Sequence, residues 1–441
     1  MKFLYIFLLF VFTGVKSQEG FTVKNGEKAV IPFKLINNLI FIPVNINGVD
    51  LTFLLDSGVN ESILFSLENK DIDFQNVEKI TFSGLGENFV IEGLKSVSNQ
   101  IKIGKSLEDN NHTVYIILDQ GINFSDQIGI PVNGIIGYQF FRNYPVQINY
   151  LTKKITVYNS PELFKKKTKN FEEFPITLEL NKPYISADVE MTRTKKSSKM
   201  LIDLGNSDAL WLFPTLIKDF VYNRPNIDDY LGRGFNGDIF GKRSRIHGLY
   251  LGKYNFVKPL AAMPYEYSIQ HLKLVNDRKG SIGSEILRRF TVIFNYPENT
   301  IFLKPNKHYN DPFLFNKSGL EIRHDGMSWE RDIVNVVTQK VYTDKAENPA
   351  NFQYKFVLKP VFSVAGCRKD SPCDKADIKK GDRIISINGK YASNLTLEKL
   401  NNMMKDDEGK YVNFQLERNS VIIKRGFYLE DPIPYQEQEN P

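Results

Sequence analysis

The stretch Leu51-Thr-Phe-Leu-Leu-Asp-Ser-Gly58 decides the fold of this chain. Four of its first five residues are apolar, which is typical of a strand buried on both faces. The strand ends on Asp56, and the following Ser57 and Gly58 are residues that favour tight turns. A carboxylate at the end of a buried strand is costly unless it is paired or hydrogen-bonded. The stretch therefore predicts a half-buried acid that is held by backbone donors.

The same pattern recurs in the second half of the chain, at Lys199-Met-Leu-Ile-Asp-Leu-Gly205. Here Asp203 and Gly205 match Asp56 and Gly58. A repeat at this spacing indicates two similar structural units, each about the size of a small lobe.

A second short motif follows each acid at nearly the same distance. Ile135-Ile-Gly137 follows the first acid, and its glycine stands 81 residues after it. Ser281-Ile-Gly283 follows the second acid, and its glycine stands 80 residues after it. Short runs of Ile, Val, Phe and Thr, broken by Asn-Gly and Ser-Gly turns, fill both halves and predict β-structure.

Composition excludes several classes of function. The net charge of +6 comes from 57 basic and 51 acidic residues that are interspersed, which does not predict a nucleic-acid partner. The five histidines are scattered without metal-ligand spacing, and no glycine-rich phosphate loop occurs, so we expect no metal and no cofactor. Cys367 and Cys373 are the only cysteines. They predict either one disulfide in an oxidising compartment or two free thiols.

The first residues predict export. Met1-Lys2 precedes an apolar run from Phe3 to Phe12, and small residues lead to a cleavage site after Ser17. This pattern is typical of a secretory signal peptide over residues 1–17, and an N-terminal membrane anchor is the alternative. No cysteine of a lipoprotein anchor lies nearby, so we expect a secreted or periplasmic protein with no stable membrane insertion after signal cleavage.

Each half resembles a retropepsin-type lobe, and the pair resembles a two-lobed aspartic protease of the pepsin-like type. The LLDSG and LIDLG loops and the IIG and SIG motifs carry this resemblance over roughly Phe21 to Pro305. It implies a mainly β fold with two β-barrel lobes related by pseudo-two-fold symmetry, over residues 18–160 and 161–306.

The resemblance also implies a catalytic pair, Asp56 and Asp203. Two close carboxylates share one proton, so one can activate a water while the other donates to the scissile carbonyl. The loops around the pair are Ser57 with Gly58, and Leu204 with Gly205. The family has a hydroxyl at the position of Leu204, and this hydroxyl braces the two loops, so the sequence predicts a one-sided brace. Ser207 could supply part of the missing bonding.

Glycine-rich hairpins in both halves match the family's flaps, which close over an extended peptide. The predicted flap residues are Leu85 and Gly86 in the first lobe, and Phe235 and Gly237 in the second. Plain hairpin turns are the alternative interpretation of these stretches.

The residues after a linker at Asn310-Asp-Pro312 resemble a PDZ domain, an α+β fold, over residues 312–431. The stretch Gly381-Asp-Arg-Ile-Ile-Ser-Ile-Asn-Gly389 carries this resemblance. PDZ domains bind a peptide at a sheet edge and hold its terminal carboxylate with backbone N–H groups. Gly319, Leu320, Glu321 and Ile322 stand where that loop is expected. A structural β-domain packed on the lobes is the alternative, and residues 432–441 are predicted to be a disordered tail.

Two functions from different classes follow. The first is an exported aspartic endopeptidase that acts on peptide or protein substrates, with the PDZ domain positioning substrates or binding C-terminal peptides. The second is an inactive two-lobed peptide-binding protein. The retained acids favour the first, and Leu204 favours the second.

Overall fold

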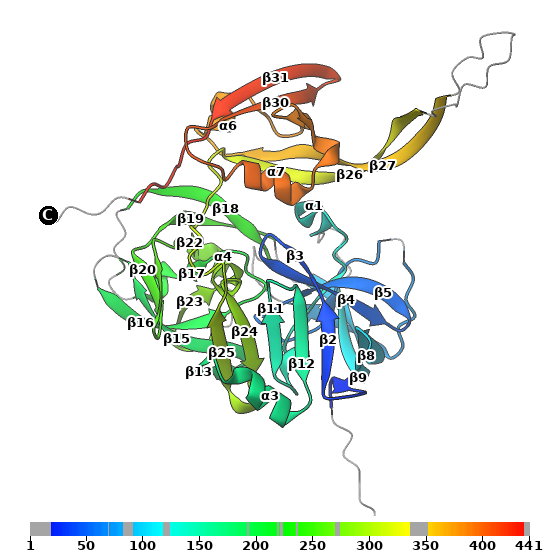
Figure 1. Ribbon diagram of the computed structural model, residues 1–441, viewed down its shortest axis with the longest axis vertical. Coiled ribbons are helices and arrows are strands. Elements are labelled where there is room, and N and C mark those ends of the chain that lie inside the picture. The colour runs from blue at the N-terminus through cyan, green and yellow to red at the C-terminus, as the bar shows by residue number, and fades with distance from the viewer. Residues whose placement is uncertain are drawn as a thin grey trace, which may run out of the picture.

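The computed structural model describes residues 19–68, 70–82, 91–117, 124–191, 194–217, 220, 224–234, 237–269, 274–335 and 352–435. The chain forms two β-rich lobes side by side, with the C-terminal domain above their junction (Figure 1). The predicted signal peptide and the predicted flap residues Leu85, Gly86 and Phe235 lie outside the described residues. Within the described ranges, no helix is both long enough and apolar enough to cross a membrane.

The first lobe is built on a nine-stranded sheet. Its strands, in spatial order, are β1 (Thr22–Val23), β9 (Leu107–Ile117), β6 (Ile63–Leu64), β10 (Gly134–Ile136), β5 (Val49–Leu55), β4 (Leu39–Ile46), β8 (Ile91–Ile103) and β7 (Val77–Phe82), with β3 (Lys34–Ile36) paired to β4. The predicted hairpin that feeds the first acid is β4 and β5, joined by a two-residue turn at Asn47 and Gly48. Both turn residues have positive φ, as a turn of this length requires.

The second lobe repeats this arrangement in a ten-stranded sheet. Its strands, in spatial order, are β18 (Asn226–Gly234), β19 (Gly237–Arg245), β22 (Leu260–Pro264), β17 (Leu210–Leu212), β23 (Arg278–Ile282), β16 (Lys195–Ile202), β15 (Lys182–Glu190), β20 (Gly248–Leu251) and β21 (Tyr254–Val257), with β14 (Thr177–Glu179) paired to β15. In both lobes the strand that ends at the acid pairs in parallel with the strand that ends at the later glycine: β5 with β10, and β16 with β23. The predicted repeat is therefore a structural repeat.

A six-stranded sheet joins the lobes. Its order is β13 (Glu172–Pro175), β25 (Thr300–Pro305), β24 (Phe290–Asn295), β11 (Val146–Asn149), β12 (Lys154–Tyr158) and β2 (Lys28–Pro32), and β11 meets β24 at the lobe boundary. Helix α3 (Pro161–Thr168) connects the halves. One continuous apolar core runs through both lobes, so they fold as one body.

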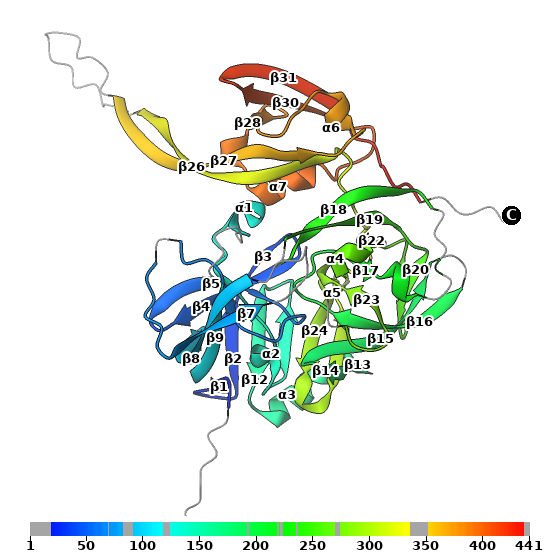
Figure 2. The ribbon, with the colours of Figure 1, turned by 180° about the vertical axis from the view of Figure 1, so that it is seen from behind.

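The C-terminal domain has its own sheet and its own apolar core. The sheet order is β26 (Leu320–Asn335), β27 (Phe352–Cys367), β28 (Arg383–Ile387), β30 (Tyr411–Arg418) and β31 (Val421–Tyr428), with β29 (Lys390–Tyr391) paired to β28. Its helices are α6 (Pro372–Lys375) and α7 (Leu397–Met403). The long hairpin of β26 and β27 extends away from the lobes (Figures 1 and 2).

The boundaries of this domain differ from the prediction. Phe313 and Phe315, assigned by sequence to the C-terminal domain, are buried in the core of the lobes. Ile433 is fully buried in the same core, so the predicted disorder from residue 432 is wrong there. The Tyr435 hydroxyl also reaches the His247 ring nitrogen Nδ1 at 2.7 Å. Apolar side chains on both flanks therefore fasten the domain to the lobes.

Candidate active site

Two loops, one per lobe, bring the predicted acids together. The Asp56 N–H donates to the Ile136 carbonyl at 3.0 Å, and the Asp203 N–H donates to the Ile282 carbonyl at 2.9 Å. Each acid is thus fixed by the last residue of the strand that runs parallel to its own. The two lobes place their acids by the same backbone bond.

The glycines of the later motifs are required by close packing. A Cβ atom on Gly137 would collide with the Val59 carbonyl, and one on Gly283 would collide with the Asp208 carbonyl. Helices α2 (Tyr138–Phe141) and α5 (Ser284–Leu287) begin directly after these glycines. Both predicted active-site loops therefore rest on a backbone that only glycine permits.

The carboxylates of Asp56 and Asp203 face each other across the lobe boundary. The Gly58 N–H donates to Asp56 Oδ1 at 2.7 Å. The Gly205 N–H donates to Asp203 Oδ1 at 3.1 Å and to Asp56 Oδ1 at 3.2 Å, so one backbone donor serves both acids. The two carboxyl groups are also close enough for each to shift the pKa of the other. This arrangement can hold one proton between two acids.

The surroundings of the two acids differ. Burial, and then the charge of Asp203, raise the pKa of Asp56 to about 7. Burial also raises the pKa of Asp203, but the cationic side chains of Arg278 and Lys182 oppose this rise. Sequence reasoning did not find these two cations. Lys182 also opposes the rise in the pKa of Asp56, whereas Arg278 acts on Asp203, and this difference favours Asp203 as the ionised member and Asp56 as the protonated one.

Asp56→Asn is expected to make the free energy of unfolding less dependent on pH between pH 4 and pH 8. The pKa of an unfolded aspartate is about 3.9, so a raised folded pKa gives stability that is complete below about pH 4 and is lost as the pH rises through 7. One such proton changes the unfolding free energy by about 1.4 kcal/mol per pH unit in this range. Thermal unfolding at pH 4 and pH 8 should therefore show a smaller decline for the variant. An equal decline in both proteins would contradict this assignment.

The brace between the loops is one-sided, as Leu204 dictates. The Ser57 hydroxyl donates to the Ile202 carbonyl at 2.7 Å and accepts from the Leu204 N–H at 3.0 Å, both across the lobe boundary. The Leu204 side chain is fully buried in the lobe core instead. Its carbonyl accepts from the Ser284 hydroxyl at 3.0 Å, which holds the second loop from its own lobe.

Leu204→Thr is expected to lower the free energy of unfolding by about 1–3 kcal/mol more than Leu204→Val, because a buried hydroxyl without a partner carries that cost. Thr and Val have the same shape, so the comparison isolates the hydroxyl. Denaturant unfolding of both variants measures the difference. A Thr variant that is the more stable of the two would show that its hydroxyl has completed the brace.

A cavity of about 1690 Å³ contains the two acids. Strand β18 lines it with residues 229–234, next to the predicted flap residue Gly237 in β19. The predicted peptide-binding residues Gly319, Leu320, Glu321 and Ile322 of the C-terminal domain line the same cavity. The two acids and the edge of the C-terminal sheet thus share one cavity. In the described part of the chain, no cluster of His, Cys, Asp and Glu could hold a metal ion.

The predicted carboxylate-binding loop is already hydrogen-bonded. The Gly319 N–H donates to Asn316 Oδ1 at 3.2 Å, and the Leu320 N–H donates to the Ser318 hydroxyl at 2.9 Å. The side chains of Leu320 and Ile322 are buried in the domain core. A terminal carboxylate would have to displace these local bonds to use the first two N–H groups.

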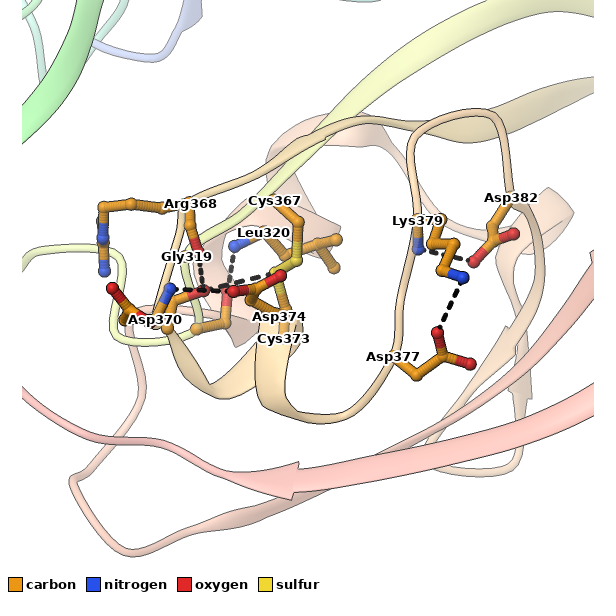
Figure 3. Close-up of a disulfide and its surroundings, with 12 residues drawn as sticks. Gly319, Leu320, Cys367, Arg368, Asp370, Cys373, Asp374, Asp377, Lys379 and Asp382 are labelled. Carbon is orange, nitrogen blue, oxygen red and sulfur yellow. Dashed lines mark hydrogen bonds and ion pairs between the residues drawn. A yellow bond between two sulfur atoms is a disulfide. The ribbon is translucent and has the colours of Figure 1, made fainter.

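A disulfide between Cys367 and Cys373 lies beside this loop (Figure 3). The two Cα atoms are 6.1 Å apart, and the bond ties the end of β27 to α6. The Arg368 N–H donates to the Gly319 carbonyl at 2.9 Å, so the cross-linked segment also holds the predicted loop. Of the two alternatives that the sequence left open, the structure contains the disulfide.

A buried Ser–His–Asp chain lies elsewhere in the first lobe. His112 Nε2 lies 2.7 Å from the Ser62 hydroxyl, and His112 Nδ1 lies 2.7 Å from Asp109 Oδ2. This connectivity occurs in nucleophilic enzymes. Ser62 is only 1% exposed and does not line the cavity, so no substrate reaches it. These hydrogen bonds join β9 to the residue that precedes β6, behind the first loop.

Comparisons with known proteins found two matching family models. A family model described as aspartyl protease matches residues 42–140, and one described as PDZ domain matches residues 357–424. No curated protein matches the chain. Among solved structures, an aspartic proteinase from Irpex lacteus is similar at 9% identity with a TM-score of 0.41, over 65% of this chain and 99% of that one. The resemblance seen in the sequence is confirmed where these models match: an aspartyl protease model over residues 42–140 of the first lobe, and a PDZ model over residues 357–424 of the C-terminal domain.

Proposed function

We propose that this protein is an aspartic endopeptidase. The observation that supports this most is the pair of facing carboxylates that share the Gly205 N–H within a large cavity. Ionised Asp203 takes a proton from a water, and protonated Asp56 donates to the scissile carbonyl. The water then attacks the carbonyl carbon, so each acid performs one half of general acid–base catalysis.

The PDZ domain is proposed to position the substrate. Strand β26 is the outermost strand of its sheet, and its first residues line the cavity that holds the acids. Helix α1 (Ser125–Ile128) of the first lobe packs against β26, so a peptide would add a strand along the remaining part of this edge and continue from there toward the catalytic pair. Export to the periplasm or the cell exterior remains our proposal from the first 17 residues of the sequence.

Incubation of the purified protein with an unstructured polypeptide tests the proposal. We expect cleavage between acidic and neutral pH, with new termini identified by mass spectrometry. Cleavage should fall above about pH 7, because both acids are then ionised. It should also fall at strongly acidic pH, where neither acid can act as a base.

The alternative function is peptide binding without hydrolysis, which the missing hydroxyl at Leu204 favours. A peptide analogue with a tetrahedral alcohol in place of the scissile carbonyl separates the two functions. An enzyme binds such an analogue more tightly than the parent peptide, because it resembles the transition state. Equal affinity for both, without cleavage, would favour the binding function.

A further inference from the structure

Two tight hairpin tips line the cavity that contains Asp56 and Asp203. Asn37 and Asn38 join β3 to β4, and Leu180 and Asn181 join β14 to β15. All four residues have positive φ, between 49° and 67°. Two-residue turns with this backbone conformation are stiff and match the twist of the flanking strands. The side chains of Asn38 and Asn181 are therefore carried on rigid supports.

Each tip reaches the catalytic loop of the other lobe. Asn38 Nδ2 donates to the Ser207 carbonyl at 3.0 Å. Asn181 Nδ2 donates to Asn60 Oδ1 at 2.8 Å. Ser207 and Asn60 each stand four residues after the aspartate of their own loop. The two contacts are related by the pseudo-two-fold symmetry of the lobes.

The first tip has a second anchor. Asn38 Nδ2 also donates to Glu285 Oε2 at 2.7 Å. Glu285 is itself fixed by ion pairs with Arg288 at 2.6 Å and with Arg289 at 2.8 Å. Arg289 is 1% exposed, so the acceptor of the Asn38 bond is held from the protein interior. The Asn38 contact is the stiffer of the two.

These contacts join the two loops where the hydrogen bonds from loop hydroxyls across the lobe boundary come from one side only. Ser57 is the only loop hydroxyl that crosses the boundary, because Leu204 has none. We propose that Asn38 and Asn181 are positioning residues that fix the separation of the two catalytic loops, each from the opposite lobe. This inference rests on the proposed peptidase function for its kinetic consequence, although its structural consequence can be tested without it.

Glycine substitutions remove these contacts while keeping the turns. Glycine adopts positive φ freely, so Asn38→Gly and Asn181→Gly leave the hairpins intact. We expect each variant to lower kcat by about 10- to 100-fold, because small displacements of catalytic groups are costly, with KM nearly unchanged. Asn37→Gly changes the first turn without removing either bond, and its kcat should equal that of the wild type.

A double-mutant cycle tests the second contact directly. Asn60→Ala and Asn181→Gly remove the same hydrogen bond from its two ends. Their combination should therefore be no slower than the slower single variant. Effects that multiply, or an unchanged kcat in both glycine variants, would overturn the positioning role.

The pH dependence of unfolding provides a readout that does not need cleavage. The charged and titratable groups that act on Asp56 or its partner are Asp203, Lys182, Arg278, Tyr184 and Tyr296. If the loops separate, repulsion between the acids weakens and the pKa of Asp56 falls. Both glycine variants should then lose less stability between pH 4 and pH 8 than the wild type.

The two readouts separate the two proposals. This pH shift in a protein that cleaves nothing would support positioning and overturn the peptidase function. Normal cleavage by both glycine variants, with an unchanged pH profile, would overturn positioning alone.

Discussion

Asp56→Asn and Asp203→Asn are each expected to reduce peptide-bond cleavage by at least about 1000-fold, within the range that general acid–base catalysis contributes. Each substitution removes one member of a proton-sharing pair. In either variant a single carboxyl group remains, and it cannot act as the base toward the water and as the acid toward the carbonyl at the same time. Initial rates on the same unstructured polypeptide, at the pH of maximal wild-type activity, measure the loss.

Both asparagine variants should keep the fold, because asparagine has the size of aspartate and can still accept the Gly58 or Gly205 N–H bond. Circular dichroism and thermal unfolding provide this control. Cleavage that persists in both variants would assign the activity to another site or to a contaminant, and the proposed mechanism would be abandoned.

Arg243→Met should lower the free energy of unfolding by about 3–5 kcal/mol, the usual cost of removing one partner from a buried ion pair. The Arg243 side chain lies in the second lobe, donating to Asp208 Oδ1 at 2.7 Å and to Asp229 Oδ2 at 2.8 Å. Methionine fills similar space but removes the ion pair of Asp208, and it leaves Asp229 with only the more distant Arg368, at 3.9 Å. Because Asp208 follows the second catalytic loop, activity should also fall.

The neighbouring Lys242 provides a matched control on the same strand. Its side chain is 48% exposed, and its nearest carboxylate, on Asp228, lies 3.7 Å away and is 73% exposed. Exposed ion pairs of this kind contribute about 0–1 kcal/mol. Urea titrations measure the free energy of unfolding of both variants, and Lys242→Met should have little effect on it. Equal effects of the two substitutions would show that burial does not control the strength of the Arg243 pairs.

Sequence patterns predicted the parts of the fold that depend on local or repeated signals. The apolar runs that end at Asp56 and Asp203, and the glycines 81 and 80 residues later, are readable because each strand places apolar side chains in the core and each glycine must admit another backbone. The PDZ domain was recognisable from the stretch Gly381 to Gly389, because a buried strand between two glycine-containing turns is also a local signal.

Contacts between distant residues could not be predicted in this way. Asn38 and Ser207 are 169 residues apart, and Asn181 and Asn60 are 121 apart, so no local pattern joins them. The only local signal is the two-residue turn, which predicts the hairpin but not what its side chain reaches. The cations beside Asp203 were missed because Lys182 and Arg278 approach it only through the folded sheet.

The attachment of the PDZ domain limits how the protein can open. Phe313 and Phe315 enter the lobe core before the domain, and Ile433 enters it afterwards. Exposing one large apolar side chain from a core costs about 1.5–3 kcal/mol. A conformation in which the PDZ domain has moved far from the cavity is therefore rarely populated. The domain is anchored in the lobe core at both of its ends, so only small rigid-body rotations of the domain have a low free-energy cost. Truncation before Phe313 would therefore damage the lobes themselves. Excision between Phe315 and Ile433, with a short linker, is the cut that would leave them whole.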